Sequence, residues 1–140
     1  MLEVRFYEQV DDALLKFAVI ISKFQGKWVL CKHKERSTWE VPGGHREPGE
    51  DILTTARREL YEESGAIVFD IRPVCVYSVI RNGEETFGML YYAEIAEFEG
   101  ELHSEIERME LFDVLPENWT YPLIQPLLIR ELERRNKEHL

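Results

Sequence analysis

Short apolar runs separated by turn residues fill the first third of the chain. Residues 16–24 (KFAVIISKF) are mostly apolar and partly β-branched, which predicts a strand. Residues 25–27 (QGK) have turn composition and residues 28–31 (WVLC) are apolar again, so the pattern predicts a hairpin. We expect a further short strand at residues 39–41, ended by the Pro42-Gly43-Gly44 triplet.

Apolar residues take a helical spacing after residue 50. Positions three and four apart form a narrow stripe that can pack on a sheet, which predicts a helix over residues 51–64. The negative charge of Glu50 or Asp51 suits the start of this helix, and Gly65 suits a left-handed cap at its end. The residues of the stripe are Leu53, Ala56, Leu60 and Ser64.

Strand character returns after this helix. Residues 66–81 and 86–96 are predicted strands joined through an Asn-Gly pair, the strongest short hairpin signal, and another strand is expected near residues 107–113. A second helix is expected to start at Pro122, with an apolar side made of Leu123, Ile124, Leu127, Leu128 and Leu132. A strand-rich chain with two separated helices favours an α/β (α+β) fold in which a mixed sheet lies between the helices.

Length and charge narrow the function classes. The 140 residues suit one domain spanning 1–140, and 44% hydrophobic residues suffice for a core. The formal net charge of −10 argues against a nucleic-acid polymer or an anionic membrane as partner, because both require a basic face. The same acidic surplus conflicts with a phosphate-bearing substrate unless a cation intervenes.

The chain shows no targeting signal and no cysteine framework. No apolar run reaches the roughly 18–20 residues that cross a bilayer, and the first residues lack the basic and apolar regions of a signal peptide. Cys31 and Cys75 form no CxxC pair and lie in apolar segments, so both are expected to be buried thiols. These features predict a cytoplasmic protein without disulfides.

Three glutamates share one side of the first predicted helix. Glu59 and Glu63 are four positions apart and Glu59 and Glu62 three, which places their Cβ atoms within about 5–6 Å. Carboxylates so placed repel each other near a helix C-terminus, where the macrodipole favours cations. A divalent cation that prefers oxygen ligands, Mg²⁺ or Mn²⁺, would balance them and bind substrate phosphates. A solvated acidic helix face is the alternative interpretation.

The residues around these glutamates favour a metal site. Arg58 is a fixed cation whose guanidinium can orient a neighbouring carboxylate, and Glu50 is its expected partner. The Gly43-Gly44 pair lets the backbone approach a metal or a phosphate closely. Between residues 44 and 66, six acidic residues stand against three arginines, so a bound metal ion is the missing cation for a phosphate substrate.

The stretch over residues 44–66 resembles the Nudix box, G-x5-E-x7-R-E-U-x-E-E-x-G-U, in which U is a bulky aliphatic residue. Every fixed position matches, and the soft departure is Ala66 at the last aliphatic position, with Ile67 next to it. The resemblance implies a Nudix-type α/β/α sandwich with a mixed β-sheet and two main helices. It also implies hydrolysis of a nucleoside diphosphate linked to a further group X.

The resemblance further implies a role for each matching residue. Glu59 and Glu63 would be the main metal ligands, and Glu62 an additional ligand at the catalytic centre. The carbonyl group of Gly43 would complete the coordination. Arg58 and Glu50 would be catalytic supporting groups that fix the orientation of the ligands.

A catalytic base is expected outside the box, as in several members of the family. Glu105 stands just before a predicted strand, where the family often places such a residue, and is the favoured candidate. Glu107 is the second choice, and a surface acid is the alternative interpretation for each of them. The other candidates are Glu97, Glu99 and Glu101.

Four residues are candidates for substrate binding. Lys32 and Arg36 could meet phosphates, although charges on an edge strand also serve solubility. Asn118 and Tyr121 precede the second helix, in the position where MutT-like enzymes read their base, and could read a purine edge. Aromatic residues on the strands either flank a base or fill the core; these are Tyr77, Phe87, Tyr91 and Tyr92.

The leading prediction is a MutT-like, Mg²⁺-dependent pyrophosphohydrolase. It would convert a nucleoside triphosphate, oxidised or not, to the monophosphate and pyrophosphate. A nucleotide-sugar or dinucleoside-polyphosphate pyrophosphatase uses the same box and stays an alternative. A non-catalytic nucleotide-sensing Nudix domain is the alternative of another class, disfavoured because all box glutamates are present. The expected partner is a small nucleotide, and the protein is expected to be a monomer or a homodimer.

Overall fold

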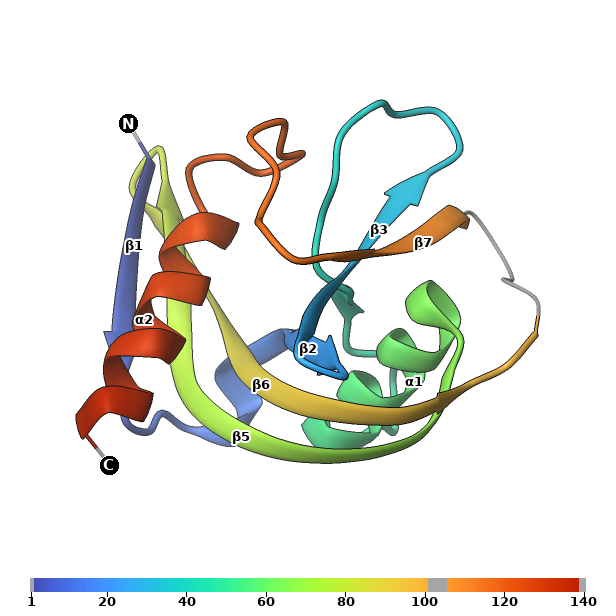
Figure 1. The fold of residues 1–140 in the computed structure, drawn as a ribbon. Helices are drawn as coiled ribbons and strands as arrows, with labels where there is room; N and C mark the ends of the chain where they lie inside the picture. The colour runs from blue at the N-terminus through green and yellow to red at the C-terminus, as the bar shows by residue number, and fades with distance from the viewer. Residues whose placement is uncertain (1, 101–105, 139–140) are drawn as a thin grey trace.

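The computed structural model describes residues 2–100 and 106–138, apart from the side chains at 106–108 and 137–138. Strands dominate this part of the chain (Figure 1). In chain order the elements are β1 (Leu2–Tyr7), the short 3-10 helix η1 (Asp12–Leu14), β2 (Leu15–Phe24), β3 (Lys27–His33), β4 (Gly43–His45), α1 (Ile52–Ser64), β5 (Ala66–Arg81), β6 (Glu84–Phe98), β7 (Ile106–Phe112) and α2 (Gln125–Glu138).

The strands of the described residues form one mixed sheet. Its order is β1-β5-β6-β2-β3-β7, and β4 pairs with β2 beside this path. β2 and β6 run parallel, whereas the other neighbouring strands run antiparallel. The long strands β5 and β6 are visibly curved (Figure 1). The predicted mixed sheet is therefore confirmed.

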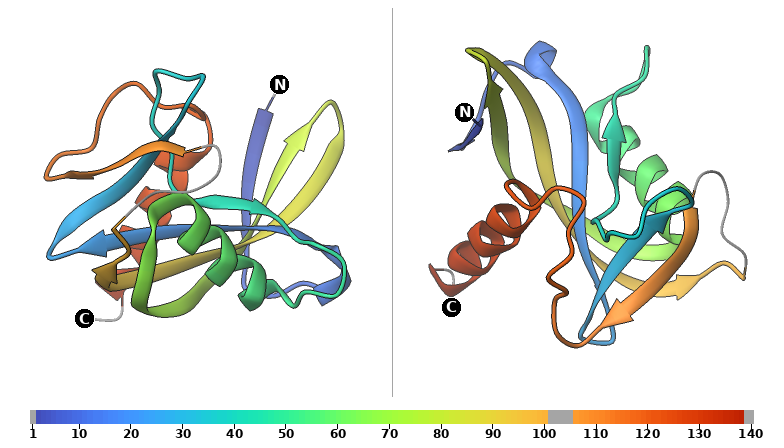
Figure 2. Two further views of the ribbon diagram at one scale, coloured as in Figure 1. Left: turned by 90° about the vertical axis from the view of Figure 1, so that its right-hand side faces the viewer. Right: turned by 90° about the horizontal axis from the view of Figure 1, so that it is seen from above.

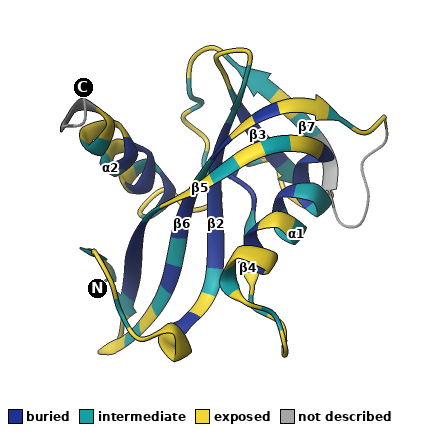
Figure 3. Ribbon diagram, turned by 90° about the horizontal axis from the view of Figure 1, so that it is seen from below, coloured by how far each residue is buried: buried dark blue, intermediate teal, exposed yellow. Residues whose placement is uncertain are grey.

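A helix covers each face of this sheet, as Figure 2 shows in its right-hand view. Alternate residues of β2 serve the two faces: Ala18 and Ile20 belong to the core under α1, and Val19 and Ile21 to the core under α2. Buried residues accordingly follow β2 through the centre of the molecule (Figure 3). On the helices, these cores include Ala56, Leu60, Leu128, Ile129 and Leu132. The predicted α/β/α sandwich is confirmed.

Local sequence signals set the ends of α1 and the two tight turns. The Asp51 carboxylate accepts a hydrogen bond from the Thr54 N–H at 2.8 Å, and Gly65 ends the helix at a φ of 80°. Gln25 and Asn82 both have a φ of 51° and are each followed by a glycine with positive φ. Two successive residues with positive φ match the twist of a hairpin, so both predicted hairpins form.

The apolar stripes of both helices differ from the prediction. Leu53 is exposed, because Ile52 faces the core and one residue along a helix turns the side chain by about 100°. α2 begins three residues after Pro122, since residues 121–124 form turns and bends. Leu123 and Leu127 are exposed, whereas the buried residues of α2 include Gln125, Leu128, Ile129 and Leu132.

The strand pattern also differs at two places. β1 is an additional strand, for which the alternation of Leu2, Val4 and Phe6 with other residues is the sequence signal. Residues 39–41 form no strand, only isolated bridges to β3 and to Trp119. The strand begins instead at Gly43, inside the triplet that was expected to end the pattern.

Two bulk expectations can be compared with the described residues. Cys31 and Cys75 are free and buried, as predicted. Neither α-helix in the described part of the chain combines the length and the apolar character that crossing a bilayer requires.

Candidate active site

The box segment lies where β4 and α1 meet β2. Gly43 and Gly44 of β4 pair with Val19 and Ala18 of β2, and a loop then leads into α1. The buried side chains Ala56 and Leu60 of α1 pack against Ala18 of β2. The helix end that carries the glutamates is therefore held beside the glycine backbone.

Both glycines allow an approach that a side chain would prevent. A Cβ atom on Gly44 would lie 2.0 Å from Oε2 of Glu59, and one on Gly43 would lie 2.8 Å from the Ala18 carbonyl oxygen. The Gly43 N–H donates a hydrogen bond to Oε1 of Glu63 at 2.7 Å. The glycine pair thus lies beside two box carboxylates, those of Glu59 and Glu63.

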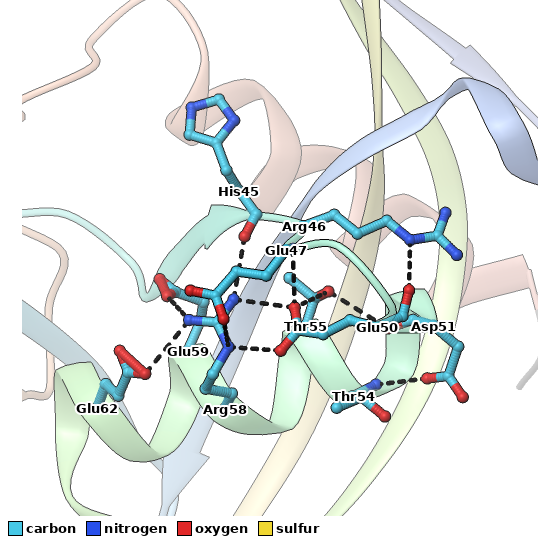
Figure 4. A network of polar contacts seen from close by, with 10 residues as sticks. All are labelled: His45, Arg46, Glu47, Glu50, Asp51, Thr54, Thr55, Arg58, Glu59 and Glu62. Carbon is cyan, nitrogen blue, oxygen red and sulfur yellow. Dashed lines mark hydrogen bonds and ion pairs between the residues drawn. The ribbon is translucent and has the colours of Figure 1, made fainter.

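Arg58 joins three carboxylates of the box (Figure 4). Its Nε and Nη2 atoms donate to both oxygens of Glu50, at 2.6 and 3.0 Å. Its Nη1 atom donates to Glu59 at 2.7 Å and to Glu62 at 3.2 Å. Nη2 also donates to the His45 carbonyl at 3.0 Å. The structure therefore brings three predicted site residues, Glu50, Glu59 and Glu62, together around the guanidinium of a fourth, Arg58.

Glu50 is fixed from several sides. Besides Arg58, it accepts hydrogen bonds from the Thr55 hydroxyl at 2.8 Å and from the Glu47 N–H at 3.0 Å. These contacts, with the hydrogen bond from Arg58 the strongest cause, lower the pKa of Glu50 to about 2. Glu50 therefore stays ionised at neutral pH, which suits an anchor for Arg58 better than a group that exchanges protons.

Burial has the opposite effect on the two carboxylates nearest β4. It raises the pKa of Glu63 to about 8, although the Gly43 N–H lowers it, and the charges of Glu59 and Glu40 raise it further. Burial also raises the pKa of Glu59, against the lowering effect of Arg58. Carboxylates that are costly to ionise in the metal-free protein gain most from a bound cation.

The direction of the Gly43 carbonyl bears on its predicted role as a ligand. Within an extended strand, the N–H and C=O groups of one residue point to the same side. Since the Gly43 N–H faces Glu63, its carbonyl points to that side as well. The oxygen donors of Gly43, Glu59 and Glu63 are of the chemical kind that a hard cation such as Mg²⁺ or Mn²⁺ prefers.

Two residues outside the box also lie at this site. His33 ends β3 and places Nε2 3.1 Å from Oε1 of Glu40 and 3.2 Å from Oε2 of Glu63. Glu40 is a buried acid in the apolar sequence WEVP, and a charged residue in such a stretch is the signal that could have identified it. His33 carries no such signal, because charged neighbours make it resemble the end of a solvated strand.

A cavity of about 580 Å³ lies beside these carboxylates. The site residues that line it are His33, Glu40, Gly43, Gly44 and Glu63. Its apolar and aromatic lining is Phe17, Val19, Tyr77, Val79, Tyr121 and Ile124, and its further polar lining includes Arg81, Asn82, Glu84 and Thr86. Such a cavity suits a ligand that has a charged part and a ring system.

The four predicted substrate-binding residues lie at different places. Tyr121 lines the cavity, and the guanidinium carbon of Arg36 lies 5.9 Å from the centroid of its ring. Lys32 donates a hydrogen bond through Nζ to the Arg36 carbonyl at 3.0 Å. Asn118 donates through Nδ2 to the Ser37 carbonyl at 3.0 Å, and so ties two loops together. Of the four, the structure brings only Tyr121 to the lining of the cavity.

The aromatic strand residues divide between the cavity and the core. Tyr77 lines the cavity and contacts Phe17 at a ring centroid distance of 5.5 Å. Phe87 instead contacts the ring of Tyr7 at 5.6 Å. Tyr91 belongs to the core under α1. Tyr77 and Tyr91 are both buried members of the hydrophobic cores, so core packing accounts for both.

The predicted base, Glu105, lies outside the described residues, as do Glu101 and the side chain of Glu107. Glu105 directly precedes β7 in the sequence, so its expected place before a strand agrees with the fold. Its catalytic role stays a prediction. The other two candidates, Glu97 and Glu99, are exposed and do not line the cavity.

Comparison with known proteins identifies the family. A model described as "NUDIX domain" matches residues 14–133. A curated relative from Bacillus subtilis (strain 168), named "Putative 8-oxo-dGTP diphosphatase YtkD", is 33% identical over 117 residues, which are 83% of this chain and 73% of the relative.

Solved structures share the fold. A mutant of the Bacillus subtilis pyrophosphohydrolase BsRppH superposes with a TM-score of 0.80 at 27% identity, covering 96% of this chain and 90% of that chain. The NUDIX domain of Shewanella oneidensis NrtR, complexed with ADP ribose, gives a TM-score of 0.68 at 16% identity over 87% of this chain and 88% of that chain. At that identity the similarity concerns the fold alone.

The family match and the geometry agree. The family match covers the strands from β2 to β7, the whole box with α1, and most of α2. Three box carboxylates contact the Arg58 guanidinium, and the fourth, Glu63, lines the cavity. The chain therefore belongs to the Nudix family of hydrolases.

Proposed function

We propose that this protein is a divalent-metal-dependent pyrophosphohydrolase of nucleoside triphosphates, including oxidised ones such as 8-oxo-dGTP. The observation that carries the proposal is a cavity whose lining combines the buried carboxylates of Glu40 and Glu63 with aromatic side chains. The name of the relative from Bacillus subtilis supports the substrate class. The name of BsRppH supports the reaction type.

Mg²⁺, or Mn²⁺ in its place, would be held by Glu59, Glu62, Glu63 and the carbonyl of Gly43. When bound, such an ion lowers the pKa of a water molecule and neutralises charge on phosphate oxygens. The oxygen-only donor set and the raised pKa of Glu63 both fit a cation of this kind. The ion also explains how a chain with a net charge of −10 accepts a polyphosphate.

Arg58 and Glu50 act as positioning residues. The Glu50 carboxylate holds the guanidinium with two hydrogen bonds, and the guanidinium in turn holds Glu59 and Glu62. A site whose charged groups are already oriented needs little reorganisation during the reaction, which is the main source of electrostatic catalysis. Loss of Arg58 would therefore misplace two ligands at once.

The aromatic lining of the cavity supports binding of the nucleoside. Tyr121 offers an exposed aromatic ring, and Phe17 and the buried Tyr77 also line the cavity. The volume of about 580 Å³ lies within the range of small-molecule sites. In the proposed binding mode the phosphates lie beside Glu63 and Gly43.

Hydrolysis consumes one water molecule and breaks the anhydride bond between the α- and β-phosphoryl groups. The products are the nucleoside monophosphate and pyrophosphate, one of which receives the oxygen of the water. Glu105 is our candidate for the base that accepts the proton of that water.

A substrate screen with Mg²⁺ tests the proposal. We expect pyrophosphate and monophosphate from nucleoside triphosphates, with 8-oxo-dGTP included in the panel. Faster turnover of nucleotide sugars or dinucleoside polyphosphates would refute the substrate class. Tight binding without hydrolysis of any compound would indicate a nucleotide-sensing domain instead.

A further inference from the structure

Two buried carboxylates face each other beside the proposed box site. The side chains of Glu40 and Glu63 are only 9% and 11% exposed. Within the described residues, their ion pairs run only to His33. Two negative charges buried together destabilise a protein unless cations or hydrogen bonds compensate them.

His33 does not satisfy both carboxylates. Its Nε2 atom lies 3.1 Å from Glu40 and 3.2 Å from Glu63, yet this nitrogen carries at most one proton. One full hydrogen bond is therefore the most that it can donate. In addition, Oε2 of Glu40 is buried and has no hydrogen-bond partner among the described residues. An acceptor so placed requires a ligand that the side chains do not supply.

We propose that His33, Glu40 and Glu63 bind a divalent transition-metal ion. One ligand atom from each of the three side chains can be chosen so that all lie within 4.8 Å of one another. Adjacent ligands of an octahedral ion with bonds of about 2.1 Å lie about 3.0 Å apart. The two distances from Nε2 of His33 match this spacing.

The nitrogen donor determines the class of metal. Imidazole suits first-row transition-metal ions such as Zn²⁺ and Fe²⁺, and carboxylates extend this set to Mn²⁺. Mg²⁺ prefers oxygen ligands alone. A site of one imidazole and two carboxylates therefore favours a transition-metal ion over Mg²⁺, in contrast to the oxygen-only set at the box.

This site is linked to the proposed function through one residue. Glu63 belongs both to the proposed box metal site and to the set of His33, Glu40 and Glu63. Oε1 of Glu63 accepts the Gly43 N–H, whereas Oε2 faces His33. His33 comes from the end of β3 and Glu40 from the loop before β4. All three ligands line the cavity, so an ion at this position would meet the same bound nucleotide.

Mn²⁺ titration of the metal-free protein without nucleotide, followed by electron paramagnetic resonance, tests the assignment. We expect His33→Asn and Glu40→Gln each to weaken one Mn²⁺ site by about tenfold or more. Mg²⁺ affinity, measured by calorimetry, should stay unchanged in both variants. His45→Asn is the matched control, because His45 lines the same cavity but lies outside the cluster. Thermal unfolding in EDTA verifies that each variant is folded.

Two results would overturn the assignment. One is Mn²⁺ binding by both variants at the affinity of the wild type. The other is an equal loss of Mn²⁺ and Mg²⁺ affinity, which would make His33 a hydrogen-bond partner that orients Glu63. Pyrophosphate release by the wild type with Mg²⁺ alone is measured in parallel. Absence of that activity refutes the proposed function and leaves the metal titration valid.

Discussion

Replacing Gly44 by alanine displaces a proposed metal ligand by a predictable amount. The new Cβ atom would lie 2.0 Å from Oε2 and 2.3 Å from Cδ of Glu59, whereas ordinary contacts begin at 3.4 Å. The carboxylate is the flexible partner, so it has to retreat by more than about 1 Å, and a misplacement of that size costs about 10²-fold in rate. We expect kcat to fall about 100-fold, or about 2.7 kcal/mol of activation free energy.

The fold should tolerate this change. The φ of Gly44 does not lie in the left-handed region, and the atoms in conflict belong to the far end of a side chain. Steady-state pyrophosphate release at saturating Mg²⁺ measures kcat, and thermal unfolding measures stability. Gly100→Ala is the matched control, because a Cβ there meets nothing within 4 Å among the described residues. A Gly44→Ala protein with the kcat of the control would refute the reasoning.

Three further predictions concern the positioning role of Arg58, the ionisation of Glu63 and nucleotide recognition by Tyr121. Arg58→Lys should lower kcat about tenfold or more in steady-state kinetics, because lysine cannot hold both oxygens of Glu50 and also reach Glu59. The rise in Tm on adding Mg²⁺ should grow from about pH 6 to about pH 9, because Glu63, with a pKa of about 8, must lose its proton to bind metal. Tyr121→Ala should change the ratios of kcat/KM among nucleotides by about tenfold while changing kcat less.

The sign of the pH effect follows from the two states of Glu63. Its pKa in the metal-free fold lies above the ordinary value of 4.5, so its contribution favours the fold at low pH and is lost as the pH rises through about 8. Bound metal offsets this loss. A rise in Tm that is constant across the range contradicts the account. Normal kcat in Arg58→Lys contradicts the positioning role, and unchanged preferences in Tyr121→Ala remove that ring from recognition.

Local features of the site were predictable because they depend on neighbours in the sequence. The spacing of Glu59, Glu62 and Glu63 follows from helix geometry, and Asp51 and Gly65 set the ends of that helix. Helix spacing also places Glu59 and Glu62 within reach of Arg58. The exposed side of α1 was less predictable, because the choice between Ile52 and Leu53 as the buried residue depends on how the helix sits on the sheet.

Contacts between distant segments were not predictable from one sequence. His33 meets Glu63 because β3 pairs with β2 and α1 packs on β2. Glu40 lies beside them because its backbone forms an isolated β-bridge with Cys31 of β3. Asn118 failed to reach the cavity lining for a similar reason, since its amide holds the loop at Ser37. Strand order decides these contacts, and no local pattern records it.

The most direct test of the central claim compares wild type and Glu59→Gln for release of monophosphate and pyrophosphate from a nucleoside triphosphate. Both proteins are assayed with Mg²⁺ and with EDTA. The account predicts rapid release by the wild type with Mg²⁺, none with EDTA, and a loss of about 10³-fold or more in the folded variant. Equal rates in the two proteins, or turnover that persists in EDTA, would contradict it.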